Sequence, residues 1–213
     1  LLLPGALMKA DMWFLTITAL ERKYRIIVPD NYALQGTFDM GAVCEAHMRI
    51  LDHEGVDTAA VIGISGGAGI AQFLFQWYPQ RVAHMVFSHS GIVKPENTER
   101  LQKRAKLIKL LPSAVFKKIL GIVTKKHRAY PPDSEWVAFR DAYLDETSTL
   151  LNKKMFLSFM TEGAKAHGAF QYDPHIAAQF KGKILILSSQ GDDWTADQMK
   201  EWTERYPNAK THV

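Results

Sequence analysis

Cysteine is almost absent from this chain, which has only Cys44 among its 213 residues. A lone cysteine cannot form an internal disulfide, and its isolation is compatible with a reducing compartment. We therefore expect a cytoplasmic location, with Cys44 packed inside a helix.

Long hydrophobic runs are absent too, since no uninterrupted apolar run approaches the roughly 20 residues that a membrane-spanning helix needs. The longest candidate, residues 12–18, is interrupted by Thr16 and Thr18. Apolar residues still make up 47% of the chain, which is enough to bury a core, so disorder is not expected. The length predicts one large soluble domain, or a core with an inserted subdomain.

A strong net charge is also lacking, because the formal net charge is only +4. The exception is the segment 100–128, which holds ten Lys or Arg residues and no acidic residue. Such a segment can face anionic lipid, nucleic acid or an acidic substrate, or form the solvated side of amphipathic helices. We favour amphipathic helices, because Val115 and Ile119 lie on an apolar stripe with Lys117 and Lys118 off it. Weak contact with a membrane surface is the alternative, and no nucleic-acid partner is expected.

The most informative stretch is Gly63-Ile64-Ser65-Gly66-Gly67, which follows the apolar residues 59–62. It matches the pattern G-x-S-x-G, in which a serine on a strained turn between a strand and a helix has its hydroxyl raised above the sheet. The other interpretation is a glycine-rich or phosphate-binding turn in which Ser65 only caps the helix. No Lys follows the glycines, which disfavours a Walker-type loop, and apolar residues at helical spacing follow the serine.

The alternation of apolar runs and helical spacing predicts an α/β fold, with a mostly parallel sheet and helices on both faces. We expect strands at residues 1–3, 24–28, 59–64, 82–87, 184–187 and 211–213. We expect helices at residues 8–23, 37–54 with Thr37 as the cap, 66–78 and 196–206.

The alternation stops at residues 94–170, where helical segments are broken by prolines and glycines. We predict an inserted helical cap there, between a first core segment, 1–93, and a second, 171–213. Both ends of the chain are expected to be cut within the fold, because it begins at the end of one strand and stops at the start of another.

The chain resembles the α/β-hydrolase fold superfamily over essentially its whole length. Three regions carry the resemblance: residues 1–5 at the oxyanion loop, residues 61–72 at the serine turn, and residues 184–193 at the strand and loop that bear the acid. The resemblance implies a serine hydrolase of esterase or lipase type. It would cleave a small-molecule ester, thioester or amide by acyl transfer, with no cofactor and no metal.

The resemblance also implies site residues. Ser65 would be the nucleophile, and backbone N–H groups of Gly66 and of Ala6 or Leu7 would form the oxyanion hole. Typical members have His-Gly where this chain has Pro4-Gly5, but an oxyanion hole uses backbone donors, so the loop remains suitable.

The acid is implied at Asp193, with Asp192 in reserve. The G-x-x-D pattern that is frequent in the family would place it one residue later, on Trp194. The alternative for the two aspartates is a turn or a helix cap before Ala196.

The catalytic histidine is not identified. In the family it follows the last strand, whereas His212 is expected within that strand and is disfavoured as the base. His89 follows a core strand and would either line the pocket or be structural. Residues 1–213 alone are therefore not expected to turn over esters, and nothing in the histidine spacing indicates a metal site.

A catalytically silent member of the fold, acting as a binding or adaptor protein, is the alternative function. Pro4 in place of the usual His and the missing base favour it. The segment Tyr206-Pro207-Asn208-Ala209 is also similar to maspardin, a member of the superfamily. Fold alone does not decide between the two functions.

Overall fold

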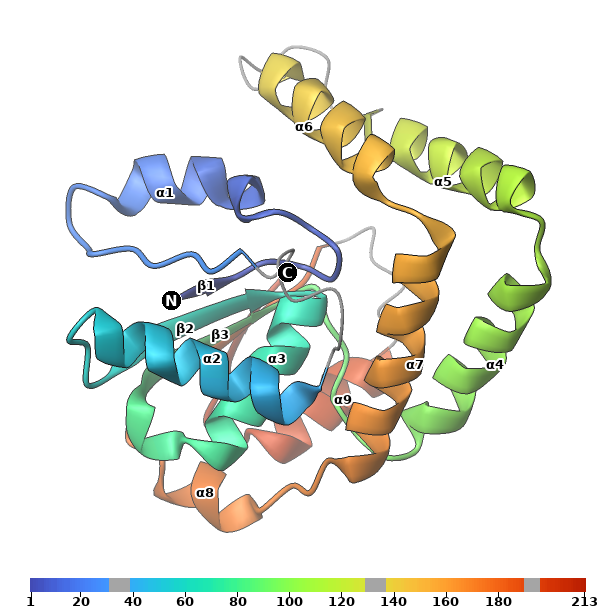
Figure 1. Ribbon diagram of the computed structural model, residues 1–213. Coiled ribbons are helices and arrows are strands. Elements are labelled where there is room, and N and C mark those ends of the chain that lie inside the picture. Colours follow the sequence, from blue (N-terminus) through green and yellow to red (C-terminus); the bar gives the residue numbers. More distant parts are fainter. Residues whose placement is uncertain (31–38, 129–136, 190–195) are drawn as a thin grey trace.

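One parallel sheet forms the centre of the protein, as seen in the computed structural model, which describes residues 1–30, 39–128, 137–189 and 196–213 (Figure 1). Within these ranges the sheet has five strands in the order β1-β2-β3-β4-β5, and every neighbouring pair is parallel. The strands are β1 (Leu2–Leu3), β2 (Ala59–Ile64), β3 (Val82–Ser88), β4 (Ile184–Leu187) and β5 (Lys210–His212). The predicted α/β architecture is confirmed.

Helices lie on both sides of this sheet. Figure 1 shows α2, α3 and α9 against one face, with α1 on the other side. The helices are α1 (Phe14–Leu20), preceded by the 3-10 turn η1 (Ala10–Trp13), α2 (Met40–His53), α3 (Gly66–Trp77), followed by the 3-10 turn η3 (Pro79–Arg81), α4 (Asn97–Leu110), α5 (Ser113–Arg128), α6 (Val137–Leu150), α7 (Lys153–Ala169), α8 (Pro174–Gln179) and α9 (Ala196–Arg205). None of the helices within the described ranges is both long and apolar enough to cross a membrane.

The core fills the space between the sheet and α2, α3 and α9. On β3, Phe87 is fully buried, and its ring lies 4.7 Å from that of Trp202 on α9, centroid to centroid. Phe73 of α3 is also buried, at the helical spacing expected from the sequence. Cys44 is buried in α2, as predicted, and burial raises the pKa of its thiol to about 12. The buried face of α3 packs on β2 and so anchors this helix, and the turn before it, on the sheet.

Two local predictions are wrong. Residues 24–28 form no strand in the described part of the chain, although they run beside β1 and the Leu2 N–H donates to the Ile27 carbonyl at 2.9 Å. With only two residues, β1 offers few backbone groups for a ladder with this segment. The cap of α2 is Asp39, whose Oδ1 accepts from the Ala42 N–H at 2.8 Å, whereas Thr37 lies outside the described residues.

The segment predicted to be the cap consists of helices. Helix α4 packs along α7, and α5 packs on α6, farther from the sheet (Figure 1). The boundaries 94 and 170 remain a prediction. Helix α8 was not predicted, although Asp173 caps it and Pro174 begins it, which is a recognisable start signal.

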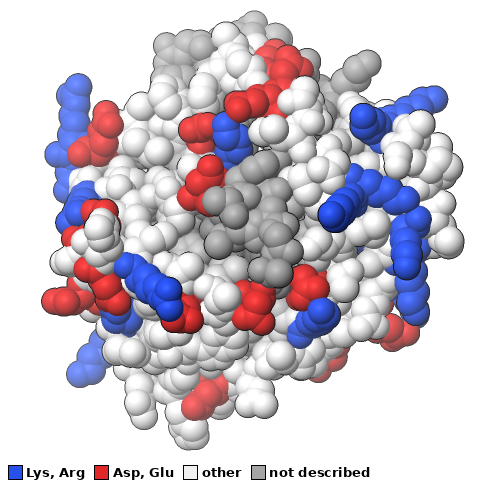
Figure 2. All heavy atoms as spheres, viewed as in Figure 1, with Lys and Arg blue, Asp and Glu red and all other residues white. Residues whose placement is uncertain are grey.

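Basic side chains lie on both flanks of the molecule in Figure 2. On the left they are interspersed with acidic side chains, whereas on the right, over α4 and α5, they have few acidic neighbours. Large apolar side chains are exposed on the same two helices: Leu107, Leu110, Val115, Ile119 and Ile122. The predicted amphipathic stripe of α5 is therefore only partly covered, with Phe116 buried and Ile122 61% exposed.

Candidate active site

The carboxyl ends of the parallel strands meet at one edge of the sheet, and the candidate residues follow them. The Ser65 N–H, after β2, donates to the Ser88 carbonyl at 2.9 Å, and the His89 N–H, after β3, donates to the Leu187 carbonyl at 2.9 Å. This is the edge at which ligands bind in open α/β sheets.

Ser65 stands at the turn between β2 and α3 in a strained conformation. Its backbone has φ +50° and ψ −117°, outside the regions that residues with a side chain ordinarily occupy. Although Ser65 is at the N-cap position of α3, its side chain makes no capping hydrogen bond, and the residue is exposed. The hydroxyl is therefore not engaged in capping the helix.

Three glycines make this turn possible because backbone passes too close for any side chain. A Cβ on Gly63 would lie 2.5 Å from the Gly67 carbonyl oxygen. A Cβ on Gly67 would lie 2.2 Å from the Leu3 oxygen, and one on Gly66 would lie 2.7 Å from the Ala6 nitrogen. Real Cβ atoms essentially never approach so closely, so the sequence pattern has a direct steric cause.

The loop after β1 lies directly against the start of α3. Leu7 there has a positive φ of +60°. The N–H groups of Ala6, Leu7 and Gly66 make no hydrogen bond with any residue in the described part of the chain. Backbone donors from both segments are thus available beside the Ser65 turn, as an oxyanion hole requires.

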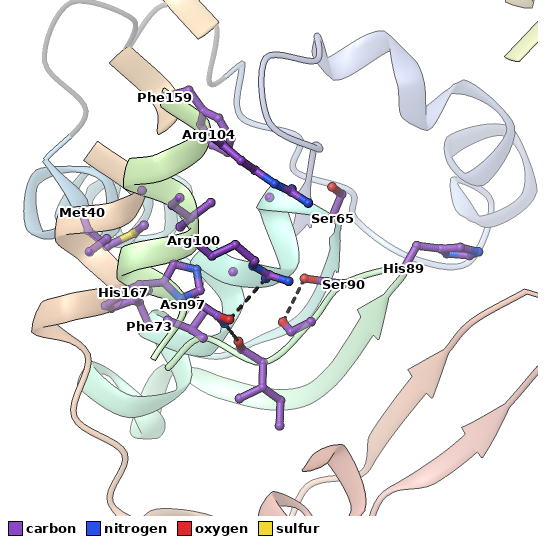
Figure 3. A pocket seen from close by; sticks show the side chains of 18 residues that line it. Met40, Ser65, Phe73, His89, Ser90, Asn97, Arg100, Arg104, Phe159 and His167 are labelled. Atoms are coloured by element: carbon purple, nitrogen blue, oxygen red, sulfur yellow. Dashed lines mark hydrogen bonds between the residues drawn. The ribbon is translucent and has the colours of Figure 1, made fainter. Parts of the chain in front are cut away.

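A cavity of about 340 Å³ opens beside Ser65 (Figure 3). Ser65 and Gly66 lie on its wall, together with residues from the loop after β3. Helix α4 contributes Asn97, Arg100, Leu101 and Arg104, and α7 contributes Phe159, Gly163 and His167. Both sets follow helical spacing, so each forms a single face of its helix. The volume is within the range of small-molecule pockets, about 300–1,000 Å³.

His89 contributes to the wall of the cavity but is not positioned beside the hydroxyl of Ser65. Its Nδ1 is 2.6 Å from the Ser88 hydroxyl and its Nε2 is 2.7 Å from the Ser189 hydroxyl. Figure 3 shows the ring pointing away from Ser65. His89, with a φ of +49°, is held at the sheet edge by polar contacts to the ends of two strands.

The remaining predicted site residues are the two aspartates and His212. Asp192 and Asp193 lie outside the described residues. His212 ends β5, where it is exposed and its carbonyl accepts from the Ser188 N–H at 3.0 Å, so it is a strand residue as expected. Within the described part of the chain, no group of three or more His, Cys, Asp or Glu residues could hold a metal ion.

Sequence reasoning missed the cavity-lining residues of α4 and α7. The sequence indicates only a basic segment, 100–128, for the two arginines of α4, and a helical cap, 94–170, for the residues of α7. The i, i+3, i+4, i+7 spacing of residues 97, 100, 101 and 104 would have placed them on one face.

The pKa of His167, on the cavity wall, is lowered by burial first, and further by the positive charges of Arg100 and Arg205.

Comparisons with known proteins agree with this architecture. Residues 1–213 match the family model described as the alpha/beta hydrolase fold, and the chain belongs to this family. No curated protein sequence matches the chain significantly.

Several solved structures share the fold at low sequence identity. MenH from S. aureus has a TM-score of 0.71 and 16% identity, covering 99% of this chain and 82% of that chain. A thermophilic esterase from Thermogutta terrifontis has a TM-score of 0.68 and 15% identity, covering 99% of this chain and 78% of that chain. A hydrolase from Pseudomonas aeruginosa has a TM-score of 0.67 and 16% identity, covering 99% of this chain and 79% of that chain. At these identities the likeness shows the fold alone.

Proposed function

We propose that this protein is a serine hydrolase of esterase type, with Ser65 as the nucleophile. The observation that carries the proposal is the strained, exposed Ser65, which lines a cavity and makes no capping bond. Membership of the alpha/beta hydrolase fold family supports it, as does the steric need for glycine at positions 63, 66 and 67. A serine that is held in a strained backbone conformation, and whose hydroxyl makes no capping hydrogen bond, is typical of a catalytic nucleophile.

The proposed reaction is acyl transfer. The Ser65 oxygen attacks the ester carbonyl while a base takes its proton, and the carbonyl oxygen becomes an oxyanion. The N–H of Gly66 and one from Ala6 or Leu7 hold that oxyanion, donors that are typically worth about 10²–10³ each in rate. The alcohol leaves with a proton, and water then cleaves the acyl-enzyme to release the acid and restore the hydroxyl.

A histidine oriented by a carboxylate is needed to activate the serine. For the carboxylate we propose Asp193, with Asp192 in reserve, because both follow β4 in the sequence. The carboxyl ends of β4 and of β2, which Ser65 follows, meet at the same edge of the parallel sheet. The histidine is not assigned, since His89 points away from Ser65 and His212 lies in a strand.

Hydrolysis of 4-nitrophenyl esters by the full-length protein tests the proposal. We expect a burst of nitrophenol that matches the enzyme concentration, followed by slower turnover, and the loss of both in Ser65→Ala. Ser90→Ala is the matched control, because Ser90 lines the same cavity with its hydroxyl bound to the Gly91 carbonyl at 3.2 Å. Turnover that survives in Ser65→Ala would show that another group is the nucleophile.

The second candidate is a non-catalytic binding protein of the same fold. One observation favours it: no described histidine is hydrogen-bonded to Ser65. A folded full-length protein that cleaves no ester but retains a small molecule in the cavity would support this function over the first.

A further inference from the structure

The cavity beside Ser65 has cationic residues on its wall, and the part of the chain that the structure describes places no acidic residue there. Its described lining residues include Arg100, Arg104 and two histidines, and none of them is Asp or Glu. Positive charge on a cavity wall attracts an anionic ligand and raises its local concentration.

Within the described ranges, the two arginines lack the carboxylate contacts that other basic residues nearby have. Arg104 makes no hydrogen bond or ion pair with any described residue. Arg100 bonds only the neutral Asn97 side chain, Nη2 to Oδ1 at 3.2 Å. By contrast, Lys103 on the outer side of the same helix pairs with Glu99 at 2.7 Å. The arginines that face the cavity therefore retain donors for a ligand.

Geometry directs these donors into the site. Figure 3 shows the Arg104 side chain extending from α4 toward Ser65, and the Arg100 side chain extending toward Ser90. Like charges at i, i+4 on one helix face disfavour the helix by a few tenths of a kcal/mol. The positive charge of Arg100 also contributes to the lowered pKa of His167 across the cavity. A bound anion would offset both effects.

We propose that the substrate is an ester that carries a carboxylate, which Arg100 and Arg104 bind while Ser65 attacks the ester carbonyl. An arginine guanidinium can bind a carboxylate with two parallel hydrogen bonds, which fixes orientation as well as charge. The apolar part of the same wall, formed by Phe73, Phe159 and Ile92, suits the carbon chain between the two groups. The inference rests on the proposed function for the ester and on the arginines for the carboxylate.

The test compares two 4-nitrophenyl esters of similar size with the full-length protein: the hemiester of glutaric acid, which carries a carboxylate, and the neutral butyrate ester. We expect kcat/KM to be higher for the hemiester. In Arg104→Gln the hemiester-to-butyrate ratio should fall about 10- to 100-fold, as for the loss of a hydrogen bond to a charged group. Arg104→Lys should keep part of the preference, because lysine keeps the positive charge but lacks the paired, planar N–H donors of the guanidinium.

Lys103→Gln is the matched control, since it removes a cation from the same helix that pairs with Glu99 outside the cavity. The ratio should stay unchanged in this variant. A ratio near one in the unmodified protein, or an equal loss in Lys103→Gln and Arg104→Gln, would overturn the inference. Thermal unfolding of each variant shows that it is folded.

Binding of glutarate to Ser65→Ala, measured by calorimetry, separates this inference from the proposed function. Binding that is lost in Ser65→Ala/Arg104→Gln, together with no ester turnover in the unmodified protein, would sustain the anion site and overturn the hydrolase. Ester turnover that depends on Ser65, with no glutarate binding and no preference for the hemiester, would do the reverse.

Discussion

Ser65 holds a backbone conformation that costs roughly 1–3 kcal/mol in isolation, so the surrounding contacts must maintain it. Those contacts are backbone approaches that only glycine tolerates, at positions 63, 66 and 67. The motif therefore reflects steric demands, which is why five residues of sequence were enough to predict the turn between β2 and α3.

Substitution of Gly67 tests this steric account. In Gly67→Ala the new Cβ would lie 2.2 Å from the Leu3 oxygen and 2.4 Å from the Pro4 oxygen, so backbone must shift. We expect the free energy of unfolding to fall by about 1–3 kcal/mol, as for overpacked cores. Gly163→Ala is the control, since its Cβ meets nothing within 4 Å and should stabilise α7 by roughly 0.5–1 kcal/mol. Similar effects of the two substitutions in urea unfolding would contradict the account.

His47 should make stability depend on pH. It is buried in α2 with Nδ1 2.6 Å from the Val43 carbonyl, and burial lowers its pKa from the ordinary 6.5. The unfolded chain therefore binds the proton more readily, so stability is full above about pH 6.5 and declines as the pH falls below it. The decline attributable to this residue is at most about 1.4 kcal/mol per pH unit.

Urea unfolding at pH 7.5 and pH 5.5 measures this dependence. His47→Gln should unfold with a smaller difference between the two pH values than the unmodified protein. His167, whose pKa is also lowered, would retain its own contribution. An unchanged difference in His47→Gln would show that the His47 proton is not coupled to folding.

At the scale of elements, sequence reasoning succeeded where a segment is governed by its own pattern. Strand β4 was placed at its observed bounds, and β2, β3 and α3 were placed within about one residue, because apolar runs and glycines mark them. The prediction of a strand at residues 24–28 was wrong because a strand needs a partner strand. The neighbouring β1 has only two residues and supplies one hydrogen bond, to Ile27. Pattern alone does not report the length of a neighbouring strand.

The start of α2 was also misplaced, and its observed cap yields a test. Asp39→Ala removes the 2.8 Å hydrogen bond to the Ala42 N–H, and we expect a loss of about 1 kcal/mol in the free energy of unfolding. Asp39→Ser should retain most of the stability, because serine caps helices nearly as well. Equal losses in the two variants would indicate that the carboxylate acts other than as a cap.

At the scale of the whole molecule, the site combines parts that the sequence reveals with parts that it does not. Ser65 and its glycines are local, so they were predictable. The proposed role of Arg100 and Arg104 depends on the packing of α4 beside α7 and on their place in the wall of the cavity beside Ser65, which no local pattern encodes. His89 was placed at the correct sheet edge, but its ring orientation is set by Ser88 and Ser189, the latter 100 residues away in the chain.

The distribution of surface residues leads to another prediction. Exposed Leu110 and Ile122 lie on α4 and α5, where basic side chains gather (Figure 2). An apolar face with a basic fringe favours the surface of an anionic membrane. We expect flotation with phosphatidylserine vesicles to exceed flotation with phosphatidylcholine vesicles, and Lys117→Glu/Lys118→Glu to reduce the difference. Equal flotation with both vesicles would remove the electrostatic contribution.

Labelling of the full-length protein with a fluorophosphonate probe, followed by mapping of the adduct by mass spectrometry, tests the central claim most directly. A serine activated for acyl transfer attacks the phosphorus, whereas ordinary serines do not react. The account predicts one adduct, on Ser65, that is absent from Ser65→Ala and from heat-unfolded protein. A folded protein that carries no adduct, or an adduct on a different serine, would contradict it.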